Sequence, residues 1–182
     1  MKKEIYFIRH WETDRNLNDI MNPWDIDSEL NNTWIEQANN VWKSLKQDWV
    51  YFDIIVSSSL QRASKTAEII AGAIWYKWEI IKMDVFKERY VGIFKDYYKK
   101  QFLEEFWVKN ISSLLEKFPN KVFEWVEKTE DFQNRINKAM KYITNNIEYS
   151  GKRILIVAHW GVGRLVTWID QIDNCKLVKI NN

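Results

Sequence analysis

The stretch Ile5-Tyr6-Phe7-Ile8-Arg9-His10 decides the fold class, because four consecutive apolar residues run directly into an arginine and a histidine. Ile154-Leu155-Ile156-Val157-Ala158-His159 repeats the pattern, and Ile54-Ile55-Val56 is a third short apolar run. Runs this short and this rich in β-branched residues favour strands over helices. Since they lack polar alternation, we expect a parallel sheet covered on both faces. Residues 80–83 and 177–180 are weaker strand candidates.

Helical patterns lie between these runs. Thr33 and Glu36 form a capping-box pattern before a helical spacing that reaches Leu45, and Ser59 is expected to cap a helix that carries Arg62 in its first turn. One helix is expected through Phe102, Phe106 and Leu114, ended by Pro119. Thr129 is expected to cap another helix, with Phe132, Ile136, Met140, Ile143 and Ile147 on one face.

Strands alternating with helices predict a three-layer α/β/α sandwich with a mostly parallel central sheet. The 182 residues suit a single domain, residues 1–182. Residues 72–130 are the least regular part, and we expect them to form a substrate-facing insertion or lid.

Composition narrows the class of protein. Apolar residues make up 46% of the chain and charged residues 29%, which argues against global disorder. A net charge of +2 is small for a nucleic-acid binder, and no apolar run is long enough for a membrane span. The N-terminus does not resemble a signal peptide, and the single Cys175 leaves no internal disulfide or cysteine-based zinc site. We therefore expect a cytoplasmic protein with neither a nucleic-acid nor a membrane partner.

The only two histidines each follow a predicted strand. His10 comes after Arg9, and His159 follows the last strong strand. Because ligands of open α/β sheets bind at the carboxyl ends of the strands, we expect both imidazoles, Arg9 and Arg62 to converge at one edge. Arginine forks match phosphate oxygens, so a phosphate site is the simplest interpretation. Cys175 is interpreted as a small packing residue.

Four segments, in order, resemble the histidine phosphatase superfamily, which has the phosphoglycerate mutase-like fold. They are Arg9-His10-Trp11-Glu12-Thr13, the segment Ser57 to Ala67, Glu88-Arg89-Tyr90-Val91-Gly92, and Ala158-His159-Trp160-Gly161-Val162. The resemblance runs from residue 4 to about 165. It implies a metal-independent enzyme without a cofactor that forms a phosphohistidine on His10.

The resemblance also implies roles for the other site residues. Arg9, Arg62 and His159 would hold the phosphate oxygens, and Glu88 would be the proton donor. Asn16 and Thr13 would lie in the phosphate pocket, although Asn16 could equally cap a turn. Substrates in such a family range from phosphorylated small molecules to phosphoproteins. The oligomeric state stays open, a homodimer included.

Three functions are compatible with this pattern. The leading interpretation is a phosphomonoester phosphatase. A phosphoglycerate mutase is the runner-up, although the stretch between Glu88 and His159 is short for one. The third is a phospho-ligand binder without catalytic activity.

The counts of glycine and tryptophan are unusual. The chain has five glycines and 11 tryptophans, where an ordinary chain of this length has about 13 glycines. Trp11, Trp34 and Trp160 stand where the resembled family has glycine, and Trp125-Val126-Glu127 resembles a family Gly-x-Glu segment. We hypothesise that many of these tryptophans are UGA codons that the native organism reads as glycine. The alternative is a genuine pseudoenzyme with tryptophan in its pocket.

Overall fold

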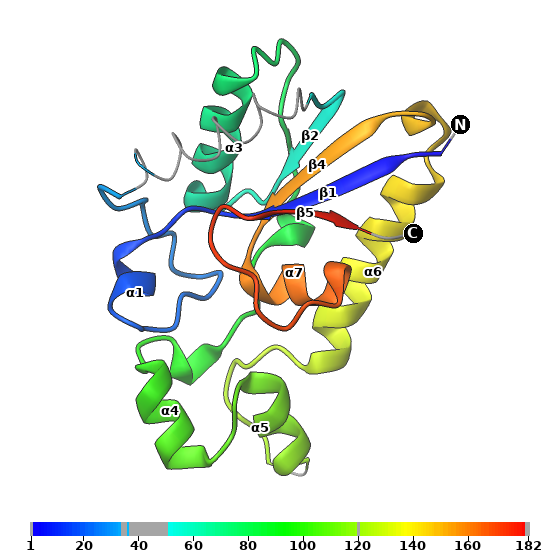
Figure 1. The fold of residues 1–182 in the computed structure, drawn as a ribbon. Helices are drawn as coiled ribbons and strands as arrows, with labels where there is room; N and C mark the ends of the chain where they lie inside the picture. Colours follow the sequence, from blue (N-terminus) through cyan, green and yellow to red (C-terminus); the bar gives the residue numbers. More distant parts are fainter. Residues whose placement is uncertain (1, 34–35, 37–50, 120, 181–182) are drawn as a thin grey trace.

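The computed structural model describes residues 2–33, 36, 51–119 and 121–180 (Figure 1). Its sheet has five strands in the order β3-β2-β4-β1-β5. The strands are β1 (Glu4–Arg9), β2 (Ile54–Ser57), β3 (Ile81–Lys82), β4 (Arg153–Ala158) and β5 (Leu177–Ile180). All neighbouring pairs are parallel except β1 with β5, which is antiparallel. The expected mostly parallel sheet is confirmed, and both weaker strand candidates belong to it.

Helices cover both faces of the sheet, which gives the expected three layers. The helix α3 (Gln61–Ala73) packs on one face, and α6 (Thr129–Asn145) and α7 (Trp160–Thr167) lie on the other (Figure 1). The remaining helical elements are α1 (Asp14–Leu17), α4 (Lys99–Phe106), α5 (Ile111–Lys117), η1 (Asp84–Phe86), η2 (Gly92–Phe94) and η3 (Ile147–Tyr149). No helix in the described part of the chain has the length and apolar character needed to cross a bilayer.

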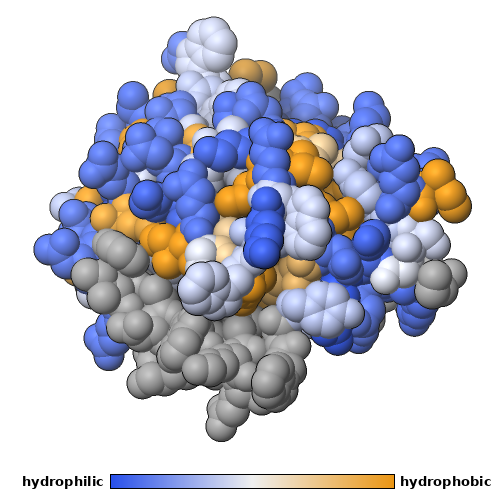
Figure 2. Space-filling view, turned by 90° about the horizontal axis from the view of Figure 1, so that it is seen from above, coloured by the Kyte–Doolittle hydropathy of each residue, from blue (hydrophilic) through white to orange (hydrophobic). Residues whose placement is uncertain are grey.

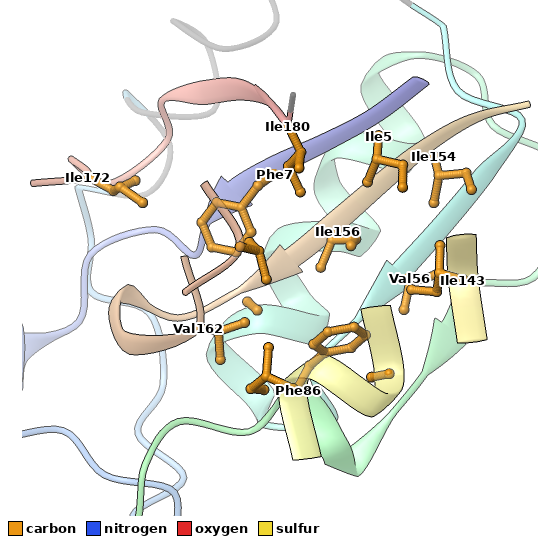
Figure 3. Close-up of a cluster of buried hydrophobic side chains, with 14 of the residues drawn as sticks. Ile5, Phe7, Val56, Phe86, Ile143, Ile154, Ile156, Val162, Ile172 and Ile180 are labelled. Carbon is orange, nitrogen blue, oxygen red and sulfur yellow. The ribbon is translucent and has the colours of Figure 1, made fainter. Parts of the chain in front are cut away.

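Strand alternation divides the core into two clusters. Ile5 and Phe7 of β1 belong to the cluster under α6 and α7, together with Ile154 and Ile156 of β4 (Figure 3). Ile8 of β1, with Leu155 and Val157 of β4, belongs to the cluster under α3. Successive side chains of a strand point to opposite faces, so a strand buried on both sides needs an unbroken apolar run.

A third apolar cluster lies away from the sheet. It joins η2, α4 and α5, which we call the cap together with their connections, and its buried members are Val91, Phe94, Phe102, Val108, Ile111, Leu114 and Phe123. In Figure 1 α4 and α5 lie apart from the sheet, on the side of α1 and α7. Residues 72–130 contain this cap, but they also contain the end of α3 and the sheet strand β3.

Several expected helix ends are wrong in detail. Leu60, not Ser59, is the N-cap of α3, because the Ser59 hydroxyl donates to Asp84 instead. Thr129 is the first residue of α6 and not its cap. The single helix expected through Phe102 and Leu114 is two helices, since Asn110 starts α5 by accepting the Ser113 N–H.

Other expectations concern the exposed end of α6 and the segment from 33 to 45. Ile147 lies beyond α6 and is 82% exposed, so it does not belong to the apolar face. The helix expected between Thr33 and Leu45 lies mostly outside the described residues.

At the surface, hydrophilic side chains (blue) are interspersed with apolar ones (orange) in Figure 2.

Candidate active site

His10 and His159 leave the carboxyl ends of adjacent strands. Arg9 at the end of β1 is the register partner of Ala158 at the end of β4, and the His10 N–H donates to the Ala158 carbonyl at 2.9 Å. The two imidazole centroids lie 5.1 Å apart, and both side chains are almost fully buried. The parallel ladder between β1 and β4 therefore brings together two residues that are far apart in sequence.

The hydrogen bonding of His10 defines which ring nitrogen is free to react. Nδ1 of His10 lies 2.6 Å from the carbonyl oxygen of Trp11. A carbonyl can only accept, so Nδ1 carries the proton and Nε2 presents its lone pair. Burial, with the charges of Arg62 and Arg9, lowers the pKa of His10 well below its usual value. His10 is thus a neutral imidazole with the tautomer that a nucleophile requires.

His159 is also held neutral. Burial is the main reason that its pKa lies well below the usual value, and the charge of Arg62 adds to the effect. Nε2 of His159 lies 2.8 Å from Oγ of Ser58, which follows β2. Nδ1 is buried and has no hydrogen-bond partner. If Ser58 donates to Nε2, Nδ1 carries the proton and can donate to an oxyanion.

Arg62 lies in the first turn of α3 and is fully buried. Its two terminal nitrogens donate to the carbonyls of Asn22, Pro23 and Ile26 at 2.8–3.1 Å, which leaves its buried Nε unpartnered. Burial lowers the pKa of Arg62 to about 10, so the guanidinium stays charged at neutral pH. The site thus keeps a fixed positive charge that the polypeptide carbonyls hold in place.

Arg9 provides a second guanidinium at the same edge. One terminal nitrogen donates to the carbonyl of Ile172 at 3.1 Å, while its Nε is buried without a partner. Buried donors without partners are uncommon in native proteins. In the described part of the chain, Nε of Arg9, Nε of Arg62 and Nδ1 of His159 are three such atoms at one edge of the sheet. Their concentration here is the pattern expected of a site that binds an anion.

Burial lowers the pKa of Arg9 and of Arg62, and the charge of Glu88 acts in the opposite direction on both. One carboxylate oxygen accepts the Arg89 N–H at 2.8 Å, and the other accepts the Gly161 N–H in the first turn of α7 at 2.9 Å. A Cβ at position 161 would lie 2.4 Å from the Glu88 carboxylate, so a larger residue there would displace that side chain. Glu88 is therefore held at the start of α7, where His159 is the N-cap, and the His10 N–H donates to the preceding residue, Ala158.

Thr13 and Asn16 have local partners. Thr13 is the N-cap of α1, where its hydroxyl accepts the Asn16 N–H at 3.3 Å and donates to the Asn16 side chain at 3.0 Å. Asn22 also donates to Thr13 at 3.0 Å. These contacts fit the alternative that Asn16 helps to form a turn, and a role of either residue in binding substrate stays a prediction.

The tryptophans next to the histidines do not behave alike. The Trp11 side chain is 1% exposed and packs in the cluster under α3, and the backbone N–H of Trp11 donates to the Thr66 hydroxyl at 3.1 Å. Trp160 is the first residue of α7, and its ring lies 4.8 Å from the Arg164 guanidinium carbon. Trp34 lies outside the described residues.

Cys175 fits its interpretation as a packing residue. Burial raises its pKa to about 12, so the thiol stays protonated and is not a nucleophile at neutral pH. Within the described residues, no group of three or more His, Cys, Asp or Glu side chains is placed to hold a metal ion.

Ser58 and Arg135 are site residues that sequence reasoning missed. Ser58 lies inside a quoted motif, yet only the fold shows its contact with His159. Arg135 of α6 donates to the carbonyls of Val85, Lys87 and Glu88. A lone arginine on an amphipathic helix carries no signal that distinguishes it from a solvated one.

Comparisons with known proteins agree with this geometry. The model of the histidine phosphatase superfamily (branch 1) matches residues 5–179. The uncharacterized phosphatase PhoE of Bacillus subtilis (strain 168) is 31% identical over 156 residues, which cover 85% of this chain and 70% of that protein. A 2,3-bisphosphoglycerate-dependent phosphoglycerate mutase of Treponema denticola is 25% identical, over 97% of this chain and 82% of the mutase.

Solved structures show the same fold. The alpha-ribazole phosphatase of Shigella flexneri superimposes with a TM-score of 0.76 at 24% identity, over 98% of this chain and 90% of that one. A phosphoglycerate mutase of Bacillus anthracis gives a TM-score of 0.76 at 21% identity, over 97% of this chain and 86% of that one. Phosphatases and mutases therefore share this architecture, and the fold alone does not separate the two activities.

Proposed function

This chain belongs to the histidine phosphatase superfamily (branch 1), and on that premise we propose that it hydrolyses phosphomonoesters through a phosphohistidine on His10. The observation that carries the proposal is the neutral His10 imidazole. Its Nδ1 proton is held by the Trp11 carbonyl, and its Nε2 lies in a buried site with two guanidiniums.

In the first step, Nε2 of His10 attacks phosphorus, and the bond from phosphorus to the ester oxygen breaks as the N–P bond forms. This step starts with Glu88 as the protonated carboxylic acid, which gives its proton to the departing oxygen, so that the product leaves as an alcohol and Glu88 becomes a carboxylate. Arg9 and Arg62 balance the charge of the equatorial oxygens, and His159 donates from Nδ1. Each such donor contributes about 3–4 kcal/mol to the transition state when its position is fixed in advance.

In the second step, water attacks the phosphohistidine. Glu88, now a carboxylate, takes a proton from the water, and the N–P bond breaks to release inorganic phosphate and neutral His10. The buried surroundings support both steps, because charges interact more strongly where water is excluded. The substrate is a phosphorylated small molecule or a phosphoprotein, and residues 72–130 would face it.

The direct test is hydrolysis of p-nitrophenyl phosphate by the full chain. We expect turnover, an acid-labile phosphoryl group on His10, and at least about a 10³-fold loss of activity in His10→Ala with the fold retained. A folded protein with neither hydrolysis nor phosphohistidine would contradict the proposal and favour a phospho-ligand binder.

A mutase is the second candidate, because mutases are among the relatives. Phosphoryl transfer between two positions of one substrate requires the intermediate to be retained while it turns around. The mutase assay is 3-phosphoglycerate conversion with and without a bisphosphorylated primer. Stimulation by the primer would favour the mutase, whereas release of phosphate without primer would favour the phosphatase.

A further inference from the structure

Four tryptophans have a left-handed backbone. The φ values are 57° at Trp75, 53° at Trp107, 58° at Trp125 and 60° at Trp168. Only a few per cent of residues other than glycine have positive φ, and for a bulky residue it is a genuine outlier. Eight tryptophans lie in the described part of the chain, so half of them adopt the conformation that glycine favours.

Three of these positions end a helix. Beyond α3, the Trp75 N–H bonds to the Gly72 carbonyl and the Tyr76 N–H to the Ala71 carbonyl, which is the Schellman pattern. Trp107 and Trp168 are the left-handed C-caps of α4 and α7. Glycine is the usual residue at such positions because it has no Cβ to strain.

The fourth position lies where two backbones touch. Gly92 also has positive φ, and a Cβ built on it would lie 2.6 Å from the carbonyl carbon of Trp125. The neighbouring residues Val91 and Val126 form an antiparallel bridge. Trp125 thus occupies one side of a crossing whose other side is a glycine.

The indole rings at these positions gain little from packing. Trp75, Trp107, Trp125 and Trp168 are 85%, 83%, 70% and 90% exposed. Large aromatic side chains normally stabilise a fold by burying their rings. Here the backbone conformation costs free energy, and ring burial does not offset that cost.

We propose that the protein made in its native cells carries glycine at positions 75, 107, 125 and 168, from UGA codons read as glycine. Backbone angles and ring exposure support this proposal, and neither depends on the proposed phosphatase activity. It also differs from the sequence evidence, because only position 125 was singled out by family resemblance. Trp11 and Trp160 lie outside the left-handed region, so their backbone angles do not favour glycine.

The native gene and protein test the proposal directly. We expect TGA at the four codons. We also expect the intact mass of the protein from native cells to be lower, for each position, by the mass difference between a tryptophan and a glycine residue. TGG codons, or a natural protein with the mass of the printed sequence, would overturn the proposal.

A stability test separates backbone strain from loss of an exposed ring. Trp→Gly at each of the four positions should raise Tm by about 2–4 °C, whereas Trp→Ala should not, because alanine keeps the strained Cβ. Trp78→Gly is the matched control, since Trp78 is 68% exposed with an ordinary backbone, and it should give no rise. An equal rise with alanine and glycine would overturn the backbone argument.

A different observation concerns the loop that carries Glu88. Arg135 donates to the carbonyls of Val85, Lys87 and Glu88 at 2.6–3.1 Å. The same guanidinium forms a two-fold ion pair with Glu127 at 2.7 and 3.0 Å. Glu127 in turn accepts the Tyr90 N–H at 3.2 Å and donates its own N–H to the Tyr90 carbonyl at 2.9 Å.

The geometry points to Arg135 as the positioning residue for Glu88, an inference that rests on the proposed function. A planar guanidinium with five donors can bind three carbonyls and a carboxylate at once, whereas a lysine ammonium has three donors and no fixed plane. The pair of Arg135 and Glu127 fixes the backbone on both sides of Glu88, so it controls where the proton donor lies.

The closing experiment compares Arg135→Met and Arg135→Lys with Lys138→Met, which removes an exposed cation from the same helix. Both Arg135 variants should speed amide hydrogen exchange at residues 86–90, and Lys138→Met should not. Unchanged exchange would overturn the positioning role of Arg135 whether or not the protein is an enzyme.

The kinetic signature depends on the leaving group. An alkyl phosphate needs a proton from Glu88, whereas p-nitrophenolate leaves without one, so Arg135→Met should lose about 10–10² times more kcat on the alkyl ester. An equal loss on both esters would show a merely structural role. An inactive wild-type protein would instead count against the proposed function.

Discussion

The sheet region and the cap are built on different physical principles. In the sheet region, a hydrogen-bonded ladder sets the register, and mostly aliphatic side chains fill both faces. In the cap, ring contacts predominate: Phe94 pairs with Tyr97, Phe102, Phe106 and Phe123 at centroid distances of 5.2–5.5 Å. The reacting groups need fixed positions, and they lie on the ladder. No strand ladder lies in the described part of the cap, and its apolar cluster contains neither His10 nor His159.

The largest expected effect compares one buried aliphatic residue from each region. Ile156 of β4 and Leu114 of α5 are both fully buried. Each replacement by alanine should cost about 2–5 kcal/mol. Ile156→Ala should lower the free energy of global unfolding, whereas Leu114→Ala should open only the cap. Native-state hydrogen exchange measures both, and equal loss of protection in the sheet would show that the two regions are one cooperative unit.

A smaller effect is expected inside the ring cluster. Phe94→Leu keeps an apolar side chain but removes four ring pairs, which should cost about 1–3 kcal/mol locally. If the cap faces the substrate, KM should rise more than kcat falls. Steady-state kinetics on several phosphate esters would measure this, with Leu103→Ala on the exposed side of α4 as the control. A fall in kcat at constant KM would contradict the separation of cap and chemistry.

The two histidines give the regions different responses to pH. Burial holds both pKa values well below the usual value near 6.5. Below about pH 6.5 the two histidines bind protons in the unfolded chain but not in the native protein. The free energy of unfolding therefore falls as the pH drops below about 6.5. Urea unfolding between about pH 7.5 and 5.5 should show the slope.

A double variant with asparagine at 10 and 159 serves as the control for this pH dependence. It should be nearly flat over the same range, because the chain has only these two histidines. Cap opening, followed by hydrogen exchange in α5, should not depend on them. A slope that persists in the double variant would assign the pH dependence to other groups.

The smallest effect lies at the end of the sheet far from the site. Hydrogen bonds from Lys179 and Arg153 lower the pKa of Glu4 to about 2. Because the unfolded carboxyl titrates near 4.5, this contribution is present above that pH and is lost as the pH falls toward 2. Glu4→Gln should weaken the acid dependence of urea unfolding in that window. Glu104→Gln in the cap, whose pairing with Lys100 is exposed, should leave it unchanged.

Sequence reasoning was most accurate where local pattern and topology agree. The unbroken apolar runs gave the buried strands, and a histidine directly after two of them gave the edge at which they meet. It failed where a distant hydrogen-bond partner or a left-handed backbone decided where a helix begins or ends. Ser59 bonds to Asp84 and does not cap α3, and the expected long helix of the cap breaks at Trp107. Neither Asp84 nor the left-handed turn is recognisable from spacing alone.

The amino-acid sequence by itself determined the layers, the parallel strands and the residues that follow them, because side-chain periodicity dictates which faces are buried. Only the tertiary structure decided that Nδ1 of His10 carries the proton and that Nε of Arg62 has no partner. It also decided the contacts of Arg135 and the backbone strain at four tryptophans. These properties depend on backbone carbonyls and backbone angles. Every residue has a carbonyl, so the sequence does not show which carbonyl will meet which side chain, and the tertiary structure decides it.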